Sequence, residues 1–189
     1  MRIITGKARG IRLKTLEGEA TRPTSERVKE AVFSMLQFDL EGREVLDLFA
    51  GSGQLGLEAL SRGAAHAVFV DQSKHAIQII EENAKKTKLD AACSIYTANS
   101  LDYIRRNCGK KFDIVFLDPP YASGLYQPIL EALYESEMLK PFSMIVCESN
   151  TEQLFGNNPM LQKKFAIKKQ TTYSKTVITI LTVNPEEAP

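Results

Sequence analysis

Two patterns of hydrophobic residues alternate along this chain. Short apolar runs are typical of buried strands, whereas longer stretches with apolar residues three or four positions apart are typical of amphipathic helices. The runs predict strands at 44–49, 66–71, 93–98, 112–117 and 142–147. The periodic stretches predict helices near 24–37, 53–62, 74–87, 100–108 and 124–138. Because strands and helices alternate, we expect an α/β fold in which helices flank a doubly wound, mainly parallel sheet.

The alternation of strands and helices ends near the C-terminus. Residues 163–169 and 176–183 are typical of two strands with no helix between them, and Tyr173-Ser174 suits the turn that joins them. We therefore predict a C-terminal antiparallel hairpin that closes one edge of the sheet.

A glycine-rich segment follows the first predicted strand. Gly51-Ser52-Gly53-Gln54-Leu55-Gly56 lies between the apolar run 45–50 and a helical stretch. Glycines at this spacing let the backbone turn tightly, approach a ligand closely and pack a helix against a strand. Asp71 lies 20 positions after Gly51, at the end of the next predicted strand, where an acid can accept both hydroxyls of a ribose. The segment predicts a nucleotide-cofactor site, and it fits a dinucleotide equally well.

Asp47 lies inside the first predicted strand, just before the glycines. A carboxylate there would repel the phosphates of a dinucleotide but would attract the sulfonium and ammonium of S-adenosylmethionine. The alternative is that Asp47 only orders the glycine turn.

Asp118-Pro119-Pro120-Tyr121 directly follows the apolar run 112–117. The Asp118 carboxylate and the Pro119 carbonyl are acceptors suited to an exocyclic NH2 group, and Tyr121 offers a face for stacking on a flat base. Neither proline has an N–H to donate, and each ring fixes the backbone direction. The alternative is a simple turn after a strand. In the predicted sheet, the ends of the first, second and fourth strands would place Gly51, Asp71 and Asp118 at one crevice.

The formal net charge of +1 conceals a basic N-terminal region. Residues 1–30 contain eight basic and four acidic residues. Basic residues among glycines predict a mobile or hairpin-like arm that binds nucleic-acid phosphates, and the alternative is an ordinary solvated edge. The candidate phosphate-binding residues are Arg2, Lys7, Arg9, Arg12 and Lys14.

Length and composition fit one catalytic domain, with a basic arm at 1–20 and a core at 21–189. The sequence has neither a long apolar run nor a signal-peptide pattern, so we expect a soluble cytoplasmic protein that does not bind membranes. Cys93, Cys108 and Cys147 lack metal-site spacing, and we expect buried, reduced thiols. His66 and His75 are too isolated for zinc, so no metal site is expected.

Four segments together resemble the RsmD-like methyltransferases, namely 2–10, 21–33, the glycine segment and 112–121. The resemblance covers nearly the whole chain and implies a Rossmann-like class I methyltransferase fold. It also implies transfer of a methyl group from S-adenosylmethionine to a guanine N2 of small-subunit (16S) ribosomal RNA. By position it assigns catalysis to Asp118, Pro119, Pro120 and Tyr121. By position it assigns cofactor binding to Asp47, Phe49, Gly51, Ser52, Gly53, Asp71, Arg22 and Thr24.

Two positions depart from the pattern of the resembling family. Many relatives have an acid after the third strand for the adenine amine, whereas this chain has Asn99 followed by Ser100. We keep both as candidate cofactor residues, because the Asn99 amide oxygen can still accept a hydrogen bond. Tyr173-Ser174 replaces the usual Tyr-Gly before the last strand, which we interpret as a turn variant.

Other functions remain open on the sequence. DNA adenine-N6 and protein glutamine methyltransferases use similar loops, because their substrates also present a planar NH2 group. An NAD-dependent oxidoreductase would explain the glycines and Asp71, and a non-catalytic RNA-binding module would explain the basic arm. We favour the ribosomal RNA enzyme, acting as a monomer on RNA in a small-subunit particle or assembly intermediate, with the target base unstacked.

Overall fold

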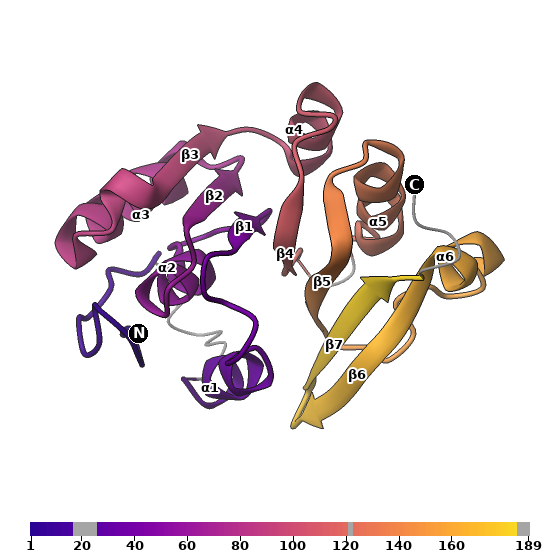
Figure 1. Ribbon diagram of the computed structural model, residues 1–189, viewed down its shortest axis with the longest axis horizontal. Coiled ribbons are helices and arrows are strands. Elements are labelled where there is room, and N and C mark those ends of the chain that lie inside the picture. The colour runs from indigo at the N-terminus through magenta and orange to yellow at the C-terminus, as the bar shows by residue number, and fades with distance from the viewer. Residues whose placement is uncertain (17–25, 121–122, 185–189) are drawn as a thin grey trace. The chain divides into compact units, whose positions relative to one another are not determined.

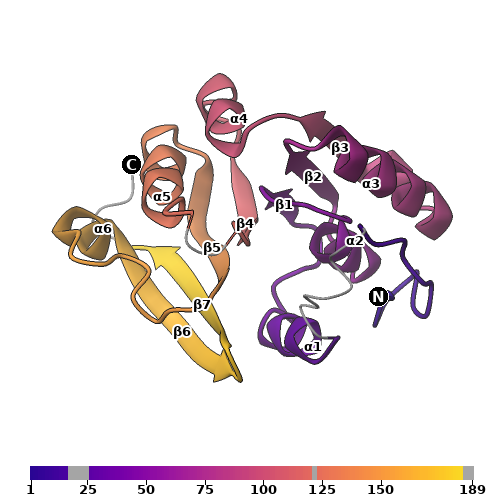
Figure 2. The ribbon, with the colours of Figure 1, turned by 180° about the vertical axis from the view of Figure 1, so that it is seen from behind.

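The computed structural model describes residues 1–16, 26–120 and 123–184 of the 189-residue chain. The chain divides into two compact units, residues 1–99 and 100–189. Each unit contains parallel strands and helices, as the ribbons in Figures 1 and 2 show from opposite sides.

The first unit is built on three parallel strands in the order β3-β2-β1. The strands are β1 (Glu44–Asp47), β2 (His66–Asp71) and β3 (Cys93–Thr97). The helices are α1 (Glu26–Met35), α2 (Gln54–Ser61), α3 (Lys74–Thr87) and the short 3-10 helix η2 (Asp90–Ala92). Helix α2 packs on β1 and β2, and α3 runs along β2 and β3 (Figure 1).

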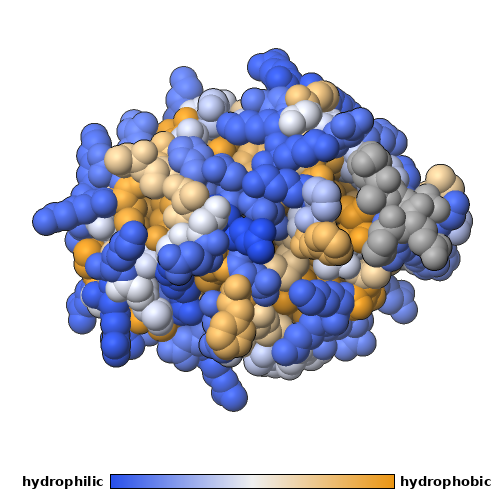
Figure 3. Space-filling view, in the orientation of Figure 1, coloured by the Kyte–Doolittle hydropathy of each residue, from blue (hydrophilic) through white to orange (hydrophobic). Residues whose placement is uncertain are grey.

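Apolar side chains and one cap explain these elements. All four residues 67–70 of β2 are fully buried, which is typical of a parallel strand covered on both faces. Helix α3 begins where the Ser73 hydroxyl accepts a hydrogen bond from the Ala76 N–H, a typical N-cap. Its buried face includes Ile77, Ile79 and Ile80. On the face drawn in Figure 3, hydrophilic residues cover most of the area and hydrophobic residues show between them.

The second unit contains four strands in the order β4-β5-β7-β6. Strand β4 runs parallel to β5, while β5 pairs with β7 and β7 with β6 in antiparallel fashion. The strands are β4 (Phe112–Leu117), β5 (Leu139–Ser149), β6 (Phe165–Tyr173) and β7 (Thr176–Val183). The helices are α4 (Ser100–Arg106), α5 (Tyr126–Glu135) and α6 (Pro159–Lys164). The predicted α/β fold with parallel strands and a C-terminal antiparallel hairpin is confirmed.

Helix α6 is one of two helical elements that the hydrophobic pattern missed, the other being the 3-10 helix η2. The Asn158 side chain accepts hydrogen bonds from the N–H groups of Met160 and Leu161, and Pro159 occupies the first turn. This is a strong helix start. Lys163 and Lys164 therefore end a helix, and the prediction that a strand begins at residue 163 is wrong. Strand β6 begins at Phe165 and turns into β7 through Ser174, whose φ is +58°.

The three cysteines are free thiols in different surroundings. Cys147 is buried and Cys93 is partly buried, but Cys108 is exposed, so the prediction of burial is wrong for Cys108. Burial raises the pKa of the Cys93 thiol to about 12, with a smaller contribution from Asp90. Burial also raises the pKa of the Cys147 thiol. Both thiols are therefore protonated and unreactive at neutral pH.

Candidate functional site

The carboxyl ends of the strands in the first unit are joined by hydrogen bonds. The N–H of Gly51, in the loop after β1, donates to Asp71 Oδ2 at the end of β2, at 2.9 Å. The Ala50 N–H donates to the Val70 carbonyl at 3.1 Å, and the Ala98 N–H donates to the Asp71 carbonyl at 3.0 Å. The predicted association of the glycine segment with Asp71 is therefore present in the structure.

The glycines allow close packing around this loop. Gly53 precedes α2 with a φ of +78°, and a Cβ there would lie 3.3 Å from two side-chain carbons of Ile80. At Gly56 a Cβ would lie 2.3 Å from Phe69 Cε1, which is closer than real Cβ contacts. Gly51 also has a positive φ, of +52°. Two glycines thus give a left-handed turn and the third lets α2 pack on β2.

Asp47 is buried beneath the loop, with 3% of its surface exposed. Its Oδ2 atom accepts a hydrogen bond from the Gly56 N–H at 3.2 Å. This contact orders the start of α2, which agrees with the alternative that Asp47 orders the glycine turn. An attraction to a cationic ligand stays a prediction.

Asp71 is half-buried and accepts two backbone hydrogen bonds. Besides the Gly51 N–H on Oδ2, the Ser73 N–H donates to Oδ1 at 2.8 Å. A carboxylate has about four acceptor positions, so two further hydroxyls can bind. Ser52 is buried at 3% exposure and Phe49 is half-buried. These residues form the cofactor half of the candidate site.

Asn83 on α3 is a functional candidate that the sequence reasoning missed. Its Nδ2 donates to the carbonyls of Ser52 and Lys14, each at 2.9 Å, and its Oδ1 accepts from the Lys14 N–H at 2.8 Å. Only 1% of Asn83 is exposed. The available signal was an amide on the apolar face of a predicted helix, three positions after Ile80.

The N-terminal residues form a short hairpin, one of the two predicted forms of the arm. Arg2 and Arg12 make an antiparallel bridge. The Ile3 N–H donates to the Ile11 carbonyl at 2.9 Å, and the Gly10 N–H donates to the Ile3 carbonyl at 2.8 Å. We call residues 1–14 the N-terminal hairpin. Residues 17–20, also assigned to the arm, lie outside the described residues.

A buried acid on α2 holds the N-terminal hairpin. The Glu58 carboxylate accepts hydrogen bonds from the N–H groups of Ile4 and Thr5 at 2.7 and 3.0 Å. It also pairs with Lys29 Nζ at 3.3 Å and with Arg62 Nε at 2.8 Å. The Glu58 and Lys29 side chains are fully buried. Burial lowers the pKa of the Lys29 ammonium below its ordinary value, although the charge of Glu58 opposes this shift.

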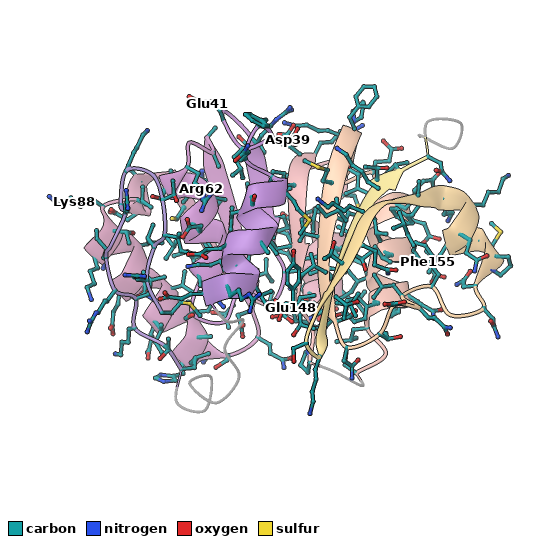
Figure 4. All side chains as sticks on the ribbon, turned by 90° about the horizontal axis from the view of Figure 1, so that it is seen from below. Asp39, Glu41, Arg62, Lys88, Glu148 and Phe155 are labelled. Atoms are coloured by element: carbon teal, nitrogen blue, oxygen red, sulfur yellow. The ribbon has the colours of Figure 1, made fainter. Side chains whose placement is uncertain are left out.

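Arg62 joins this cluster from the end of α2 (Figure 4). Its guanidinium lies 4.8 Å from the centre of the Phe33 ring on α1. Lys29, also on α1, donates from Nζ to the Arg2 carbonyl at 2.6 Å. Helices α1 and α2 thus hold one end of the N-terminal hairpin through charged groups.

The predicted phosphate-binding side chains are exposed, and they lie at different places on the N-terminal hairpin. Arg2 and Arg12 line a hollow of about 350 Å³, with Met1 and Glu26. Arg2 and Arg9 line a second hollow, of about 160 Å³. Lys14 instead pairs with Glu82 on α3 at 2.9 Å. Arg2 therefore lines both hollows, and it is paired as Lys14 is, since its Nε lies 3.2 Å from Glu26 Oε2.

The candidate catalytic loop begins at the carboxyl end of β4 in the second unit. Leu117 is fully buried, Asp118 is half-buried, Pro119 is buried and Pro120 is exposed. The Pro120 carbonyl accepts a hydrogen bond from the Ser123 N–H at 3.1 Å. Tyr121, Arg22 and Thr24 lie outside the described residues.

Glu148 lies near the carboxyl end of β5, as Asp118 lies after the carboxyl end of β4. The sequence analysis did not identify Glu148 as a candidate. Leu117 pairs with Cys147, so Asp118 and Glu148 each follow a paired residue at the same edge. Glu148 is 8% exposed and is labelled in Figure 4. Its carbonyl accepts a hydrogen bond from the Tyr126 hydroxyl of α5. An acid directly after an apolar run was the available signal, as at Asp71 and Asp118.

The remaining candidates lie on either side of the boundary between the units. Asn99 is exposed after β3, and Ser100 is the buried first residue of α4. Within the first unit, the structure brings together Asp47, Gly51, Ser52, Gly53 and Asp71. A crevice shared with Asp118 stays a prediction.

Two negative findings apply to residues 1–16, 26–120 and 123–184. No helix there combines the length and apolar character of a membrane span. No group of three or more His, Cys, Asp or Glu side chains there could hold a metal ion.

Comparison with known proteins places this arrangement in a family. A family model described as conserved hypothetical protein 95 matches residues 1–182. The chain belongs to this family. It is 40% identical over 155 residues to the putative rRNA methyltransferase YlbH of Bacillus subtilis, covering 80% of this chain and 84% of that protein.

A second relative of the family has a more specific name. The chain is 37% identical over 155 residues to ribosomal RNA small subunit methyltransferase D of Haemophilus influenzae, covering 81% of this chain and 80% of that protein. The resemblance to the RsmD-like methyltransferases is thereby confirmed.

Solved structures in and beyond the family have the same fold. The putative methyltransferase yhhF from Escherichia coli matches with a TM-score of 0.83 and 29% identity, covering 97% of each chain. An RNA methyltransferase from Salinibacter ruber, solved in complex with S-adenosyl-L-homocysteine, matches with a TM-score of 0.68 and 17% identity, covering 88% of this chain and 96% of that one. The predicted Rossmann-like methyltransferase fold is confirmed.

Proposed function

We propose that this protein transfers a methyl group from S-adenosylmethionine to N2 of a guanine in small-subunit (16S) ribosomal RNA. The observation that carries the nucleotide-cofactor part of the proposal is the Gly51–Asp71 hydrogen bond, which fixes a glycine turn beside an acid with spare acceptor positions. The small-subunit enzyme from Haemophilus influenzae, at 37% identity, supports the choice of ribosomal RNA.

The first unit would hold the cofactor. Asp71 would accept hydrogen bonds from the ribose hydroxyls, and the Asn99 amide oxygen would accept one from the adenine amine. The glycine turn gives close backbone approach, and the buried Asp47 carboxylate would favour a cationic ligand over a phosphate. The other proposed contacts are Phe49, Ser52, Ser100, Arg22 and Thr24. S-adenosylmethionine supplies a methyl group bound to a positively charged sulfur.

The loop after β4 would hold the guanine amine. The lone pair of this nitrogen is delocalised into the ring, so the amine is a weak nucleophile. Asp118 and the Pro119 carbonyl would accept its two hydrogens and favour a pyramidal nitrogen, which stabilises the transition state more than the ground state. The nitrogen would form a bond to the methyl carbon as the carbon–sulfur bond breaks and its electron pair stays on sulfur, so that S-adenosylhomocysteine leaves and the nitrogen loses one hydrogen as a proton. Tyr121 would stack on the base, and Pro120 would keep the loop rigid.

The RNA would reach this loop with the target base unpaired. Arg2 and Arg12 line one hollow at the N-terminal hairpin and Arg2 and Arg9 line another. These side chains would contact phosphates, and Lys7 and Lys14 would add to this charge. We propose that the enzyme acts as a monomer in the cytoplasm on a small-subunit particle or assembly intermediate, with both units forming one methyltransferase.

The test is transfer of tritium from labelled S-adenosylmethionine to small-subunit particles from cells that lack this protein. Nucleoside analysis should place the label in N2-methylguanosine. The label should be absent with Asp118→Ala and present with Asp90→Ala, whose side chain lies on the exposed helix η2. Label in DNA adenine or in protein glutamine, with none in RNA, would overturn the proposal in favour of those methyltransferases.

A further inference from the structure

Phe142 in the second unit is both exposed and strained. Its exposed fraction is 88% and its φ is +63°. A bulky residue in the left-handed region is an uncommon conformation that costs about 1 to 2 kcal/mol. Exposing a large aromatic side chain forgoes burial as well. Because strain of this kind concentrates at functional sites, Phe142 is a candidate contact residue.

The backbone around Phe142 is a defined bulge. Phe112 pairs with Leu139 and Ile114 pairs with Met144, so the single residue Asp113 on β4 faces residues 140–143 on β5. Lys140 Nζ lies 2.7 Å from Asp113 Oδ2 and ties the base of the bulge to β4. Ser143 is 2% exposed, and its Oγ has no hydrogen-bond partner among the described residues. Bulges of this kind re-aim a side chain, here the Phe142 ring.

Basic residues are frequent in the two segments of the second unit that lead into β4 and β5. We call Phe142 and five basic residues the Phe142 surface, the basic residues being Arg105, Arg106, Lys110, Lys111 and Lys140. The two segments 105–113 and 137–144 contain these five basic residues and two acids, Asp113 and Glu137. Lys168 on β6 adds a sixth positive charge, since its Nζ lies 3.7 Å from Met144 Sδ. The net excess is larger than that of the whole chain, which is +1.

The Phe142 surface lies at the opposite end of β4 from the candidate catalytic loop. Parallel strands β4 and β5 begin at the same edge, where the loop 107–111 and the bulge are found. Asp118 follows the other end of β4, six residues from Phe112, or about 20 Å along an extended strand. A group bound at Phe142 is therefore a different part of the substrate from the reacting base.

We propose that the Phe142 surface is a second RNA-contact site, where Phe142 stacks on an unpaired base and the basic side chains contact the flanking phosphates. This proposal rests on the proposed function. A positive groove with an exposed aromatic ring is the usual chemistry for single-stranded RNA. One protruding ring is too small an apolar area for a stable protein interface, which buries about 800 Å² on each partner.

The absence of tryptophan from the sequence gives a direct readout. Phe142→Trp introduces a single indole, which small-subunit particles should quench on stacking. The matched control is Phe38→Trp in the first unit, because Phe38 is 91% exposed but is followed closely by the acids Asp39 and Glu41 (Figure 4). We expect quenching at position 142 and none at position 38. Unchanged emission from Trp at 142 with particles that the same variant methylates would overturn the proposal while leaving the proposed function intact.

A kinetic measurement separates RNA binding from catalysis. Phe142→Ala should raise the KM for particles about tenfold, because a stacked base contributes on that scale, and should leave kcat and cofactor affinity unchanged. Replacement of Lys110 and Lys111 by Gln should reduce the dependence of particle binding on salt. A wild-type KM for Phe142→Ala would contradict the proposal. Self-association in sedimentation that Phe142→Ala abolishes would contradict it too, since the surface would then bind a second copy of this chain.

Discussion

The side-chain amide of Asn83 donates a hydrogen bond to the Ser52 carbonyl, 31 residues away, at 2.9 Å. The same amide group bonds the backbone of Lys14 in both directions. One buried side chain on α3 therefore connects the glycine turn with the end of the N-terminal hairpin. A substitution at Asn83 therefore removes hydrogen bonds from both the candidate cofactor site and the candidate RNA-binding arm.

Asn83→Ala should lower the free energy of unfolding by about 2 kcal/mol, because the buried Ser52 carbonyl and two partly buried backbone groups of Lys14 lose their partner. It should also weaken cofactor binding, since the Ser52 carbonyl loses its restraint. Denaturant unfolding and calorimetric titration with S-adenosylhomocysteine measure the two effects. Gln78→Ala, on the exposed face of α3, is the control and should change neither quantity.

Asp71→Ala should weaken cofactor binding by at least tenfold. The variant loses the proposed ribose acceptor as well as the carboxylate that holds the Gly51 and Ser73 N–H groups. Titration with S-adenosylhomocysteine measures the affinity, and circular dichroism checks that the fold is retained. An affinity equal to that of wild type would remove Asp71 from the proposed cofactor site.

Asp118→Asn should lower the single-turnover rate of methyl transfer about a hundredfold while the cofactor affinity stays within twofold of wild type. The amide keeps the shape of the side chain but replaces one charged acceptor with a donor, and an acceptor used in the transition state contributes on this scale. Rapid-quench kinetics with labelled cofactor measure the rate. Equal losses in rate and affinity would indicate that Asp118 binds the cofactor instead of acting on the amine.

Glu58→Ala should lower the free energy of unfolding by about 3 to 5 kcal/mol, because it leaves the Lys29 ammonium buried without its carboxylate. Hydrogen exchange at Ile4 and Thr5 should become faster, since both N–H groups lose their acceptor. The control is Glu82→Ala, which removes the exposed pair with Lys14 and should cost less than about 1 kcal/mol. Similar losses for both variants would contradict the role given to Glu58.

Lys29 should make the stability of the protein depend on alkaline pH. Its pKa is lowered from 10.5 by burial, against the opposing effect of Glu58. Between the lowered pKa and 10.5 the unfolded chain binds more protons than the folded chain, so the free energy of unfolding from this group rises with pH. Urea unfolding at a series of pH values below 10.5 should show this rise in wild type and a smaller slope in Lys29→Met. The exposed Lys86→Met is the control, and should leave the slope unchanged.

The hydrophobic pattern predicted β2 and β4 well because their burial is nearly continuous. Every residue from Ala67 to Val70 is fully buried, as are the four residues 114–117 of β4. Strand β5 extends from Leu139 to Ser149, beyond the predicted 142–147, because its first part is a bulge with exposed residues. Helix α6 begins at a short Asn-Pro signal that the apolar pattern of its few residues does not reveal.

The site was predictable where chemistry and local spacing coincide. Gly51 and Asp71 follow neighbouring strands, and the parallel sheet brings such ends together. Glu58 and Asn83 were not predictable, because their partners lie 54 and 69 residues away and a polar residue in a helix normally faces water. Only the tertiary structure shows that the N-terminal hairpin covers them.

The N-terminal hairpin is attached through its main chain and the buried side chains of Ile3, Ala8 and Leu13, which separates attachment from the exposed charged side chains. Glu58 and Ser61 bind the N–H groups of residues 4, 5, 7 and 8, which every residue except proline carries. Position 6 requires glycine, since a Cβ there would lie 1.7 Å from the Ser61 carbonyl oxygen. The exposed side chains of Lys7 and Arg9 can therefore change without loss of docking. The hairpin is a platform whose surface charge, and with it the proposed contact with RNA, can be redesigned while the core of the first unit stays the same.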